Sequence, residues 1–235
     1  MSDIVLTAGV RSNLLQLQKT ADLITATQTK LATGKRVNSA LDNPINFFTA
    51  QGLSNRANDL SNLLDSMSNG INTIRAADNG ITSITKLVQS AQALVSQAQQ
   101  TADTAVRSSL ATQYDALRAQ IDQLSADAGI NGINLLGGNN LTVTLNETGS
   151  SSVTVTGVTF DTTGLAVAAA ANAWAADADI TAASTELTAA LTTLRSQAQA
   201  FSTNLSTVQI RQDFTKAMIN TLQIGADSLT QADSN

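Results

Sequence analysis

Apolar residues recur with heptad spacing in two long stretches of this chain that are otherwise rich in Ala, Thr, Ser and Gln. The first stretch places them at Leu53, Ala57, Leu60, Leu64, Met67, Ile71 and Ile74. The second places them at Leu187, Leu191, Leu194, Ala198, Phe201, Leu205 and Val208. Such a repeat lines one side of a helix, and the stripes are buried when helices pack lengthwise. The pattern predicts a mainly α protein, an elongated antiparallel helical bundle or coiled-coil stem.

The amino-acid composition excludes most kinds of catalysis. Cysteine and histidine are both absent, which removes the thiol nucleophile, the disulfide, the commonest general base and the commonest metal ligand. The carboxylates are scattered and are not grouped with a nucleophile and a base. We therefore expect a protein that is not an enzyme and uses neither a metal nor a cofactor.

The charge distribution argues against nucleic acid and membrane as partners. The net charge is −5, and no lysine or arginine lies between Arg118 and Arg195, so a concentrated basic patch is lacking. No apolar run is long enough to cross a bilayer, and the N-terminus lacks the regions of a cleavable signal. We expect no nucleic-acid binding, no membrane insertion and no cleaved signal peptide.

Residues 3–33 are predicted to form one amphipathic helix that stops at Gly34, because glycine is a common C-terminal cap. A turn-rich linker over residues 35–44 detaches this helix from the rest of the chain. Isolated amphipathic helices are marginal in water, so we expect it to fray in the free monomer and to become ordered on partner chains. We interpret its apolar seam as a polymerisation surface formed by Val10, Leu14, Leu17, Ala21, Ile24 and Leu31.

Three further helices are predicted. They cover about residues 44–99, with a kink or a stutter rather than a break at residues 78–80, then 105–128 and 180–224. The last eleven residues, 225–235, are expected to fray. The predicted stem core consists of Leu53, Leu60, Leu64, Met67, Ile71, Ile74, Leu117, Ile121, Leu187, Leu191, Leu194, Phe201, Leu205 and Val208.

The periodicity changes to alternation after residue 140. Apolar residues alternate with threonine in 141–145 and again in 153–160, and a polar turn at 147–152 separates the two runs. This predicts a small β-hairpin on the tip of the helical stem, with a bulge near Gly157 and its apolar face against the helices. Residues 164–178 are either a loose connection or a short helix that caps the hairpin.

Four stretches of the chain resemble bacterial flagellins, and they occur in the same order. They are LATGKRVNSALDNPINFFTAQGLSNRA at 31–57, INTIRAADNGITSITKLVQSAQAL at 71–94, INGINLLGG at 130–138 and TVQIRQDFTKAMINTLQIGADSLTQADSN at 207–235. The segment NSALDNPINFFTAQ is similar to the alphaproteobacterial type.

The resemblance implies a homo-oligomeric subunit that self-assembles into the flagellar filament for motility. By analogy, residues 1–43 are the inner-core helix and linker, 44–138 and 179–235 are the two parts of the outer-core stem, and 139–178 are a variable, surface-exposed insertion. The resemblance also implies an extracellular flagellar location, reached through the flagellar export apparatus with its chaperone and without signal cleavage.

Two departures from the family pattern generate expectations. Flagellins normally continue past the position of Asn235 into a C-terminal helix that pairs with the first one, so we expect this chain to fold but to polymerise poorly. In enterobacterial flagellins, the innate-immune receptor reads arginines before a leucine and a glutamate on the next helix. The equivalent positions here are Ser90, Gln92, Ala93, Leu94 and Gln113. Without those charged groups we expect weak or no receptor activation.

Two other functions remain open at the level of sequence. A hook-filament junction protein shares the terminal-helix design, although INGINLLGG favours a flagellin. A surface adhesin or glycan-binding protein would use the hairpin and the Ser/Thr-rich residues 148–163, yet a binding pocket usually needs clustered aromatic residues and only Phe160 and Trp174 lie nearby. The Ser/Thr run is either O-glycosylated or a plain polar turn.

Overall fold

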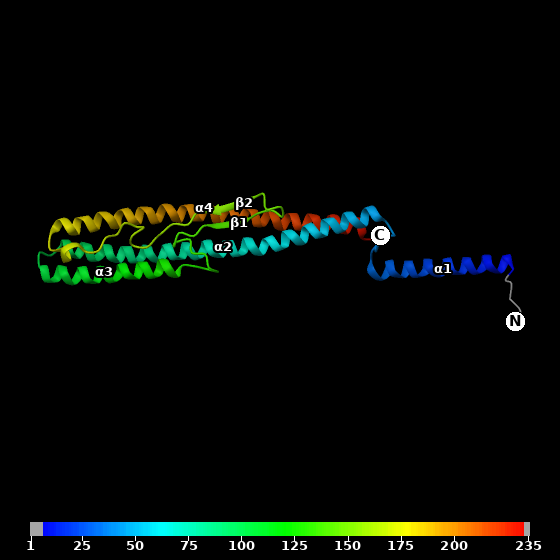
Figure 1. Ribbon diagram of the computed structural model, residues 1–235, viewed down its shortest axis with the longest axis horizontal. Helices are drawn as coiled ribbons and strands as arrows, with labels where there is room; N and C mark the ends of the chain where they lie inside the picture. Colours follow the sequence, from blue (N-terminus) through cyan, green and yellow to red (C-terminus); the bar gives the residue numbers. More distant parts are fainter. Residues whose placement is uncertain (1–6, 233–235) are drawn as a thin grey trace. The chain divides into compact units, whose positions relative to one another are not determined.

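A computed structural model describes residues 7–232 of the chain. Its long helices are α1 (Ala8–Thr33), α2 (Pro44–Gln99), α3 (Thr104–Asp127) and α4 (Asp177–Thr230), as Figure 1 shows. Between α3 and α4 the chain forms the strands β1 (Leu141–Thr144) and β2 (Ser152–Val155) and the 3₁₀ turn η1 (Ala171–Trp174). The chain forms two compact units, one from the residues up to 59 together with those from 217 onward, the other from residues 60–216. The predicted mainly α fold with long packed helices and a small hairpin is confirmed.

The helix boundaries depend on local capping groups. α2 has the predicted bounds, and α3 begins at Thr104 because the Asp103 carboxylate accepts hydrogen bonds from the amides of Ala105 and Val106. α1 begins at Ala8 and not at residue 3, since Thr7 has an extended backbone at the cap position. Residues 3–6 of that prediction lie outside the described residues.

The end of α4 differs from the prediction. The helix continues to Thr230 instead of stopping near Ile224. Leu222 and Ala226 are buried in the first unit, and the Thr230 hydroxyl donates to the Ala226 carbonyl, so the last turns are packed and do not fray as predicted. Residues 233–235 lie outside the described part of the chain.

The second unit is built around one apolar core that α2, α3 and α4 share with the hairpin and the segments around it. α2 remains helical through residues 78–80, so the expected absence of a break is confirmed. The buried face shows two successive three-residue steps, Ile71 to Ile74 to Ala77, before the 4-3 spacing resumes. Two short steps in succession are a stammer and not the stutter that the sequence suggested.

Glycines on α2 admit parts of the chain that follow α3. A Cβ on Gly70 would lie 2.6 Å from Val143 Cγ2, and a Cβ on Gly80 would lie 2.6 Å from Leu136 Cδ1. The hairpin therefore lies against the side of α2 and not at the tip of the stem, which corrects the prediction. The reason is that a missing side chain in the middle of α2 makes room for Val143 there.

The hairpin is shorter than its sequence pattern. β1 and β2 pair antiparallel with Leu141 opposite Val155, and the ladder ends there. The amides of Val158 and Phe160 donate to the carbonyls of Leu135 and Leu136, 2.7 and 2.9 Å away. The predicted second strand therefore stops early because its continuation bonds to the loop that precedes β1.

Residues 164–178 contain a short helical turn, but it packs on α3 and does not cap the hairpin. Trp174 in η1 is fully buried, with its ring centroid 5.0 Å from that of Tyr114 on α3. The Arg107 guanidinium on α3 donates to the Thr101 carbonyl and forms an ion pair with Asp177 at the start of α4. These contacts hold α3, η1 and the start of α4 together at the end of the second unit where the chain passes from α2 to α3.

The single tyrosine provides a titration test of this closure. Burial raises the pKa of Tyr114 to about 12, from an ordinary value of 10.0. Phenolate absorbance of the native protein should therefore titrate near pH 12, and near pH 10 in denaturant. Because the folded-state pKa is the higher one, the stability contributed by the neutral phenol is complete below pH 10 and is lost as the pH rises through about 12. A native midpoint near 10 would show that Tyr114 is accessible to solvent.

The position of the hairpin on α2 can be tested with Gly70→Ala. The added methyl group collides with Val143, so the substitution should lower the free energy of unfolding by about 1–3 kcal/mol, measured by denaturation with Trp174 fluorescence. The double variant Gly70→Ala/Val143→Ala should recover part of that loss. Gly52→Ala is the matched control, because nothing lies within 4 Å of a Cβ there. Equal stability of Gly70→Ala and the wild type would contradict the described position of the hairpin.

Candidate assembly surface

α1 has no partner among the described residues of the chain. None of its residues is buried, and Val10, Leu14, Leu17, Ile24 and Leu31 have exposed fractions between 47% and 84%. Ala21, the remaining residue of the predicted seam, is also exposed. All six residues lie on one continuous helix at the expected 4-3 and 7 spacings, so the structure places them together as a solvent-facing apolar stripe.

The linker after α1 is fastened at its start, whereas the sequence suggested a detached segment. Gly34 ends α1 with a left-handed backbone, φ 64°, and its carbonyl accepts a hydrogen bond from Ala232. The amides of Arg36 and Val37 both donate to the Thr230 carbonyl, at 2.8 and 3.2 Å. We call these backbone contacts the clasp. Val37 is buried there, so the clasp fixes the point from which α1 emerges, while α1 itself stays uncovered.

Asp42 holds the turn that follows the clasp. Its Oδ2 accepts hydrogen bonds from the amides of Asn38 and Ser39, each 3.0 Å away, and one from the Ser39 hydroxyl at 3.3 Å. The hydrogen bond from the Asn38 amide, and after it the one from the Ser39 amide, lowers the pKa of the Asp42 carboxyl below its ordinary value. The turn is thereby fixed at neutral pH and loosens as the pH falls and the carboxylate becomes protonated.

The structure also exposes apolar residues that the sequence interpretation missed. On α1 these are Leu15 and Leu23, which lie off the seam. At the start of α2 they are Leu41, Ile45 and Phe48, whose 4-3 spacing was a readable signal. On α4 they are Ile210, Phe214 and Ile224. Ile210 is only two positions beyond the buried Val208, which turns it about 200° around the helix, onto the solvent side.

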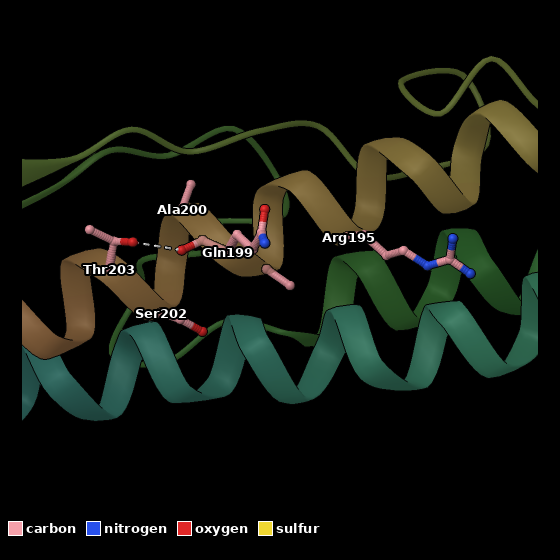
Figure 2. Close-up of a pocket in the computed structure, with 6 residues that line it drawn as sticks. Arg195, Gln199, Ala200, Ser202 and Thr203 are labelled. Atoms are coloured by element: carbon pink, nitrogen blue, oxygen red, sulfur yellow. Dashed lines mark hydrogen bonds between the residues drawn. The ribbon is translucent and has the colours of Figure 1, made fainter.

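An open groove runs along α4 in the second unit. It has a volume of about 810 Å³ and is lined by Arg195, Ala198, Gln199, Ala200, Ser202 and Thr203. Figure 2 shows the Thr203 hydroxyl turned back to the Gln199 carbonyl, to which it donates at 3.0 Å. That hydroxyl is therefore already bonded within α4, and four of the six lining residues, Ala198, Ala200, Ser202 and Thr203, have small side chains.

The predicted stem residues occupy the helix-packing faces. Ten of the fourteen are buried: Leu60, Met67, Ile71, Ile74, Ile121, Leu187, Leu191, Leu194, Phe201 and Val208. The other four are half-buried: Leu53, Leu64, Leu117 and Leu205. A second small core in the first unit, unforeseen from the sequence, contains Val37, Ala50, Leu222 and Ala226.

The positions compared with the immune-receptor surface lie on α2 and α3. Ser90, Ala93 and Gln113 are exposed, whereas Leu94 is half-buried against the core. Gln92 is half-buried and its amide donates to the Thr188 hydroxyl on α4 at 3.4 Å. None of these five side chains carries a charge, so none of them can form an ion pair with a partner.

Nothing in residues 7–232 resembles a reactive centre. That part of the chain contains no group of three or more acidic side chains placed to hold a metal ion. No helix within it combines the length and the apolar content that crossing a bilayer requires. The apolar stripes and the α4 groove are the features that point to binding, and their chemistry suits protein helices.

Comparisons with known proteins point to one family. A family model described as the bacterial flagellin N-terminal helical region matches residues 7–141, more than half of the chain. Among solved structures, the crystal structure of Bacillus cereus flagellin matches with a TM-score of 0.54 and 21% sequence identity, over 66% of this chain and 88% of that one. At that identity the structural likeness concerns the fold alone. No curated protein matches the chain in sequence.

The Asp42 turn is tested by Asp42→Ala. Removing the acceptor should speed amide hydrogen exchange at Asn38 and Ser39, because both amides lose their partner. Asp59→Ala, an exposed carboxylate on α2, is the control and should leave both rates unchanged. Unchanged exchange in Asp42→Ala would mean that the turn is held by other contacts.

Proposed function

Because the chain belongs to the bacterial flagellin family and is a subunit of the flagellar filament, we propose that copies polymerise through the seam of α1. The observation that supports this most strongly is the complete exposure of a 26-residue amphipathic helix in a chain whose other long helices all bury apolar residues. Its seam is the set predicted from the sequence: Val10, Leu14, Leu17, Ala21, Ile24 and Leu31.

The energetics favour a partner for α1. Moving one Leu or Ile side chain fully out of water is worth about 1.5–3 kcal/mol, and an isolated helix is marginal even at this length. Intermolecular contacts along the seam both bury those side chains and order the helix. The clasp supports this role because it fixes where α1 begins in each copy, so that one copy presents its seam in the same way as the next.

The same proposal assigns each segment of the chain to a part of the filament. Residues 1–43 supply the inner helix and its linker, residues 44–138 and 179–235 form the stem of the outer layer, and residues 139–178 form the surface insertion. Part of that insertion is structural, because Val143, Phe160 and Trp174 are buried in the core of the second unit. Its exposed residues include 147–150 in the turn between β1 and β2 and most of 168–178.

The remaining assignments rest on the resemblance of the motifs. The subunit is exported by the flagellar export apparatus with a chaperone, without cleavage of a signal, and acts outside the cell. The likeness of the segment NSALDNPINFFTAQ, which spans the turn held by Asp42 and the start of α2, supports an assignment to the alphaproteobacterial type.

The seam is tested by Leu17→Glu. A carboxylate in the stripe should abolish concentration-dependent self-association in sedimentation velocity, because burying an unpaired charge is unfavourable. Ser12→Glu is the matched control, since it places the same charge on the opposite face of α1 and should associate like the wild type. Circular dichroism and Trp174 fluorescence check that both variants fold. Equal association of all three proteins would refute the proposed role of α1.

The lack of charged side chains at Ser90, Gln92, Ala93, Leu94 and Gln113 predicts weak or no activation of the innate-immune flagellin receptor. Reporter cells treated with purified protein should give a small fraction of the signal produced by an enterobacterial flagellin at the same concentration, because charge-assisted hydrogen bonds are missing. A response comparable to that positive control would show that recognition does not depend on those charges.

A further inference from the structure

Exposed apolar residues are concentrated at the start of α2 as well as on α1. Leu41, Ile45 and Phe48, which we call the α2 cluster, are 97%, 77% and 64% exposed. Phe48 is also held in place, since its ring packs edge-on against Phe47 at a centroid distance of 5.5 Å. Single exposed apolar residues are ordinary, but three within eight positions of one chain segment indicate a binding surface.

The α4 groove has the complementary shape. Besides Arg195 and Gln199 it is lined by the small side chains of Ala198, Ala200, Ser202 and Thr203, so a neighbouring helix can approach α4 closely there. The same side of α4 continues into the exposed Ile210 and Phe214, which extend the groove with apolar surface. Large side chains that fill gaps between small ones are the usual arrangement where helices pack.

We propose that the α2 cluster of one copy packs into the α4 groove of a second copy. This inference rests on the proposed function, because the filament is what supplies a second copy. It adds a contact that does not involve α1 and assigns two surfaces of the stem to each other.

Charge complementarity selects this pairing. Arg195 at one end of the groove is exposed and makes no hydrogen bond or ion pair with any described residue. Asp42 stands next to Leu41 in the cluster and uses only Oδ2 in its own turn, which leaves Oδ1 available for a partner. Ile45 and Phe48 follow Asp42 by three and six residues, and Ala198 and Ser202 follow Arg195 by three and seven. With Asp42 beside Arg195, the α2 cluster therefore comes to lie over the small side chains when the two segments run in the same direction.

The contact joins two different surfaces, so two copies do not form a closed, symmetric dimer through it. A surface that binds a different surface of the next copy leaves one of each kind free at the ends of every assembly. Repetition of such a contact produces an open, filament-like series of subunits. This is the symmetry that a flagellar subunit needs.

Cysteine pairing tests the contact directly, because the natural chain contains no cysteine. Ile45→Cys protein is mixed with Gln199→Cys protein at concentrations where copies associate, and the mixture is oxidised mildly. Disulfides form only when the two Cα atoms come within about 7 Å. The control mixture pairs Ile45→Cys with Gln123→Cys, an exposed position on α3. A third protein, Leu14→Cys, reports association through α1 on its own.

The expected result is at least about tenfold more disulfide heterodimer from the Ile45/Gln199 pair than from the control pair, because a specific contact raises the effective concentration of the two thiols. Leu14→Cys dimers without an Ile45/Gln199 excess would overturn this inference alone. The Ile45/Gln199 excess without Leu14→Cys dimers would support the inference and refute the role of α1. If neither species forms, both proposals fail.

Discussion

Burial of apolar stripes between helices is the interaction on which this structure depends. In the second unit, each helix turns its stripe inward, and residues such as Met67, Ile121 and Leu194 lose nearly all contact with water. Among the described residues, the aromatic side chains in this core are the Tyr114–Trp174 pair, Phe160 and Phe201. α1 carries a stripe of the same kind, but the described chain offers nothing to cover it. The proposed assembly through α1 follows from that one uncovered stripe.

The clasp connects this stripe to the rest of the molecule in a defined way. It is made of backbone hydrogen bonds from Arg36 and Val37 to Thr230 and from Ala232 to Gly34, so it depends little on side-chain identity. It lies beside the small core around Leu222 and Ala226. A helix that emerges from a fixed point can be presented in register by many identical copies, which is what a filament requires.

The heptad pattern was sufficient to predict α2, the seam of α1 and the packing faces of the stem, because lengthwise helix packing depends on local periodicity. It failed where distant residues decide the outcome. The position of the hairpin on α2 depends on the space left by Gly70. The second strand is short because the residues after it donate hydrogen bonds to the Leu135 and Leu136 carbonyls. The last turns of α4 were missed because their packing depends on the clasp, which brings the two chain segments together only in the folded state.

The central claim is that α1 is covered by other copies of the chain and not by the chain itself. Amide hydrogen exchange along residues 8–33 measures this most directly, in dilute monomer and in assembled protein. The account predicts rapid exchange in the monomer and strong protection after assembly, while residues of the second unit stay protected in both states. Equal exchange of α1 in the two states, whether fast or slow, would contradict it.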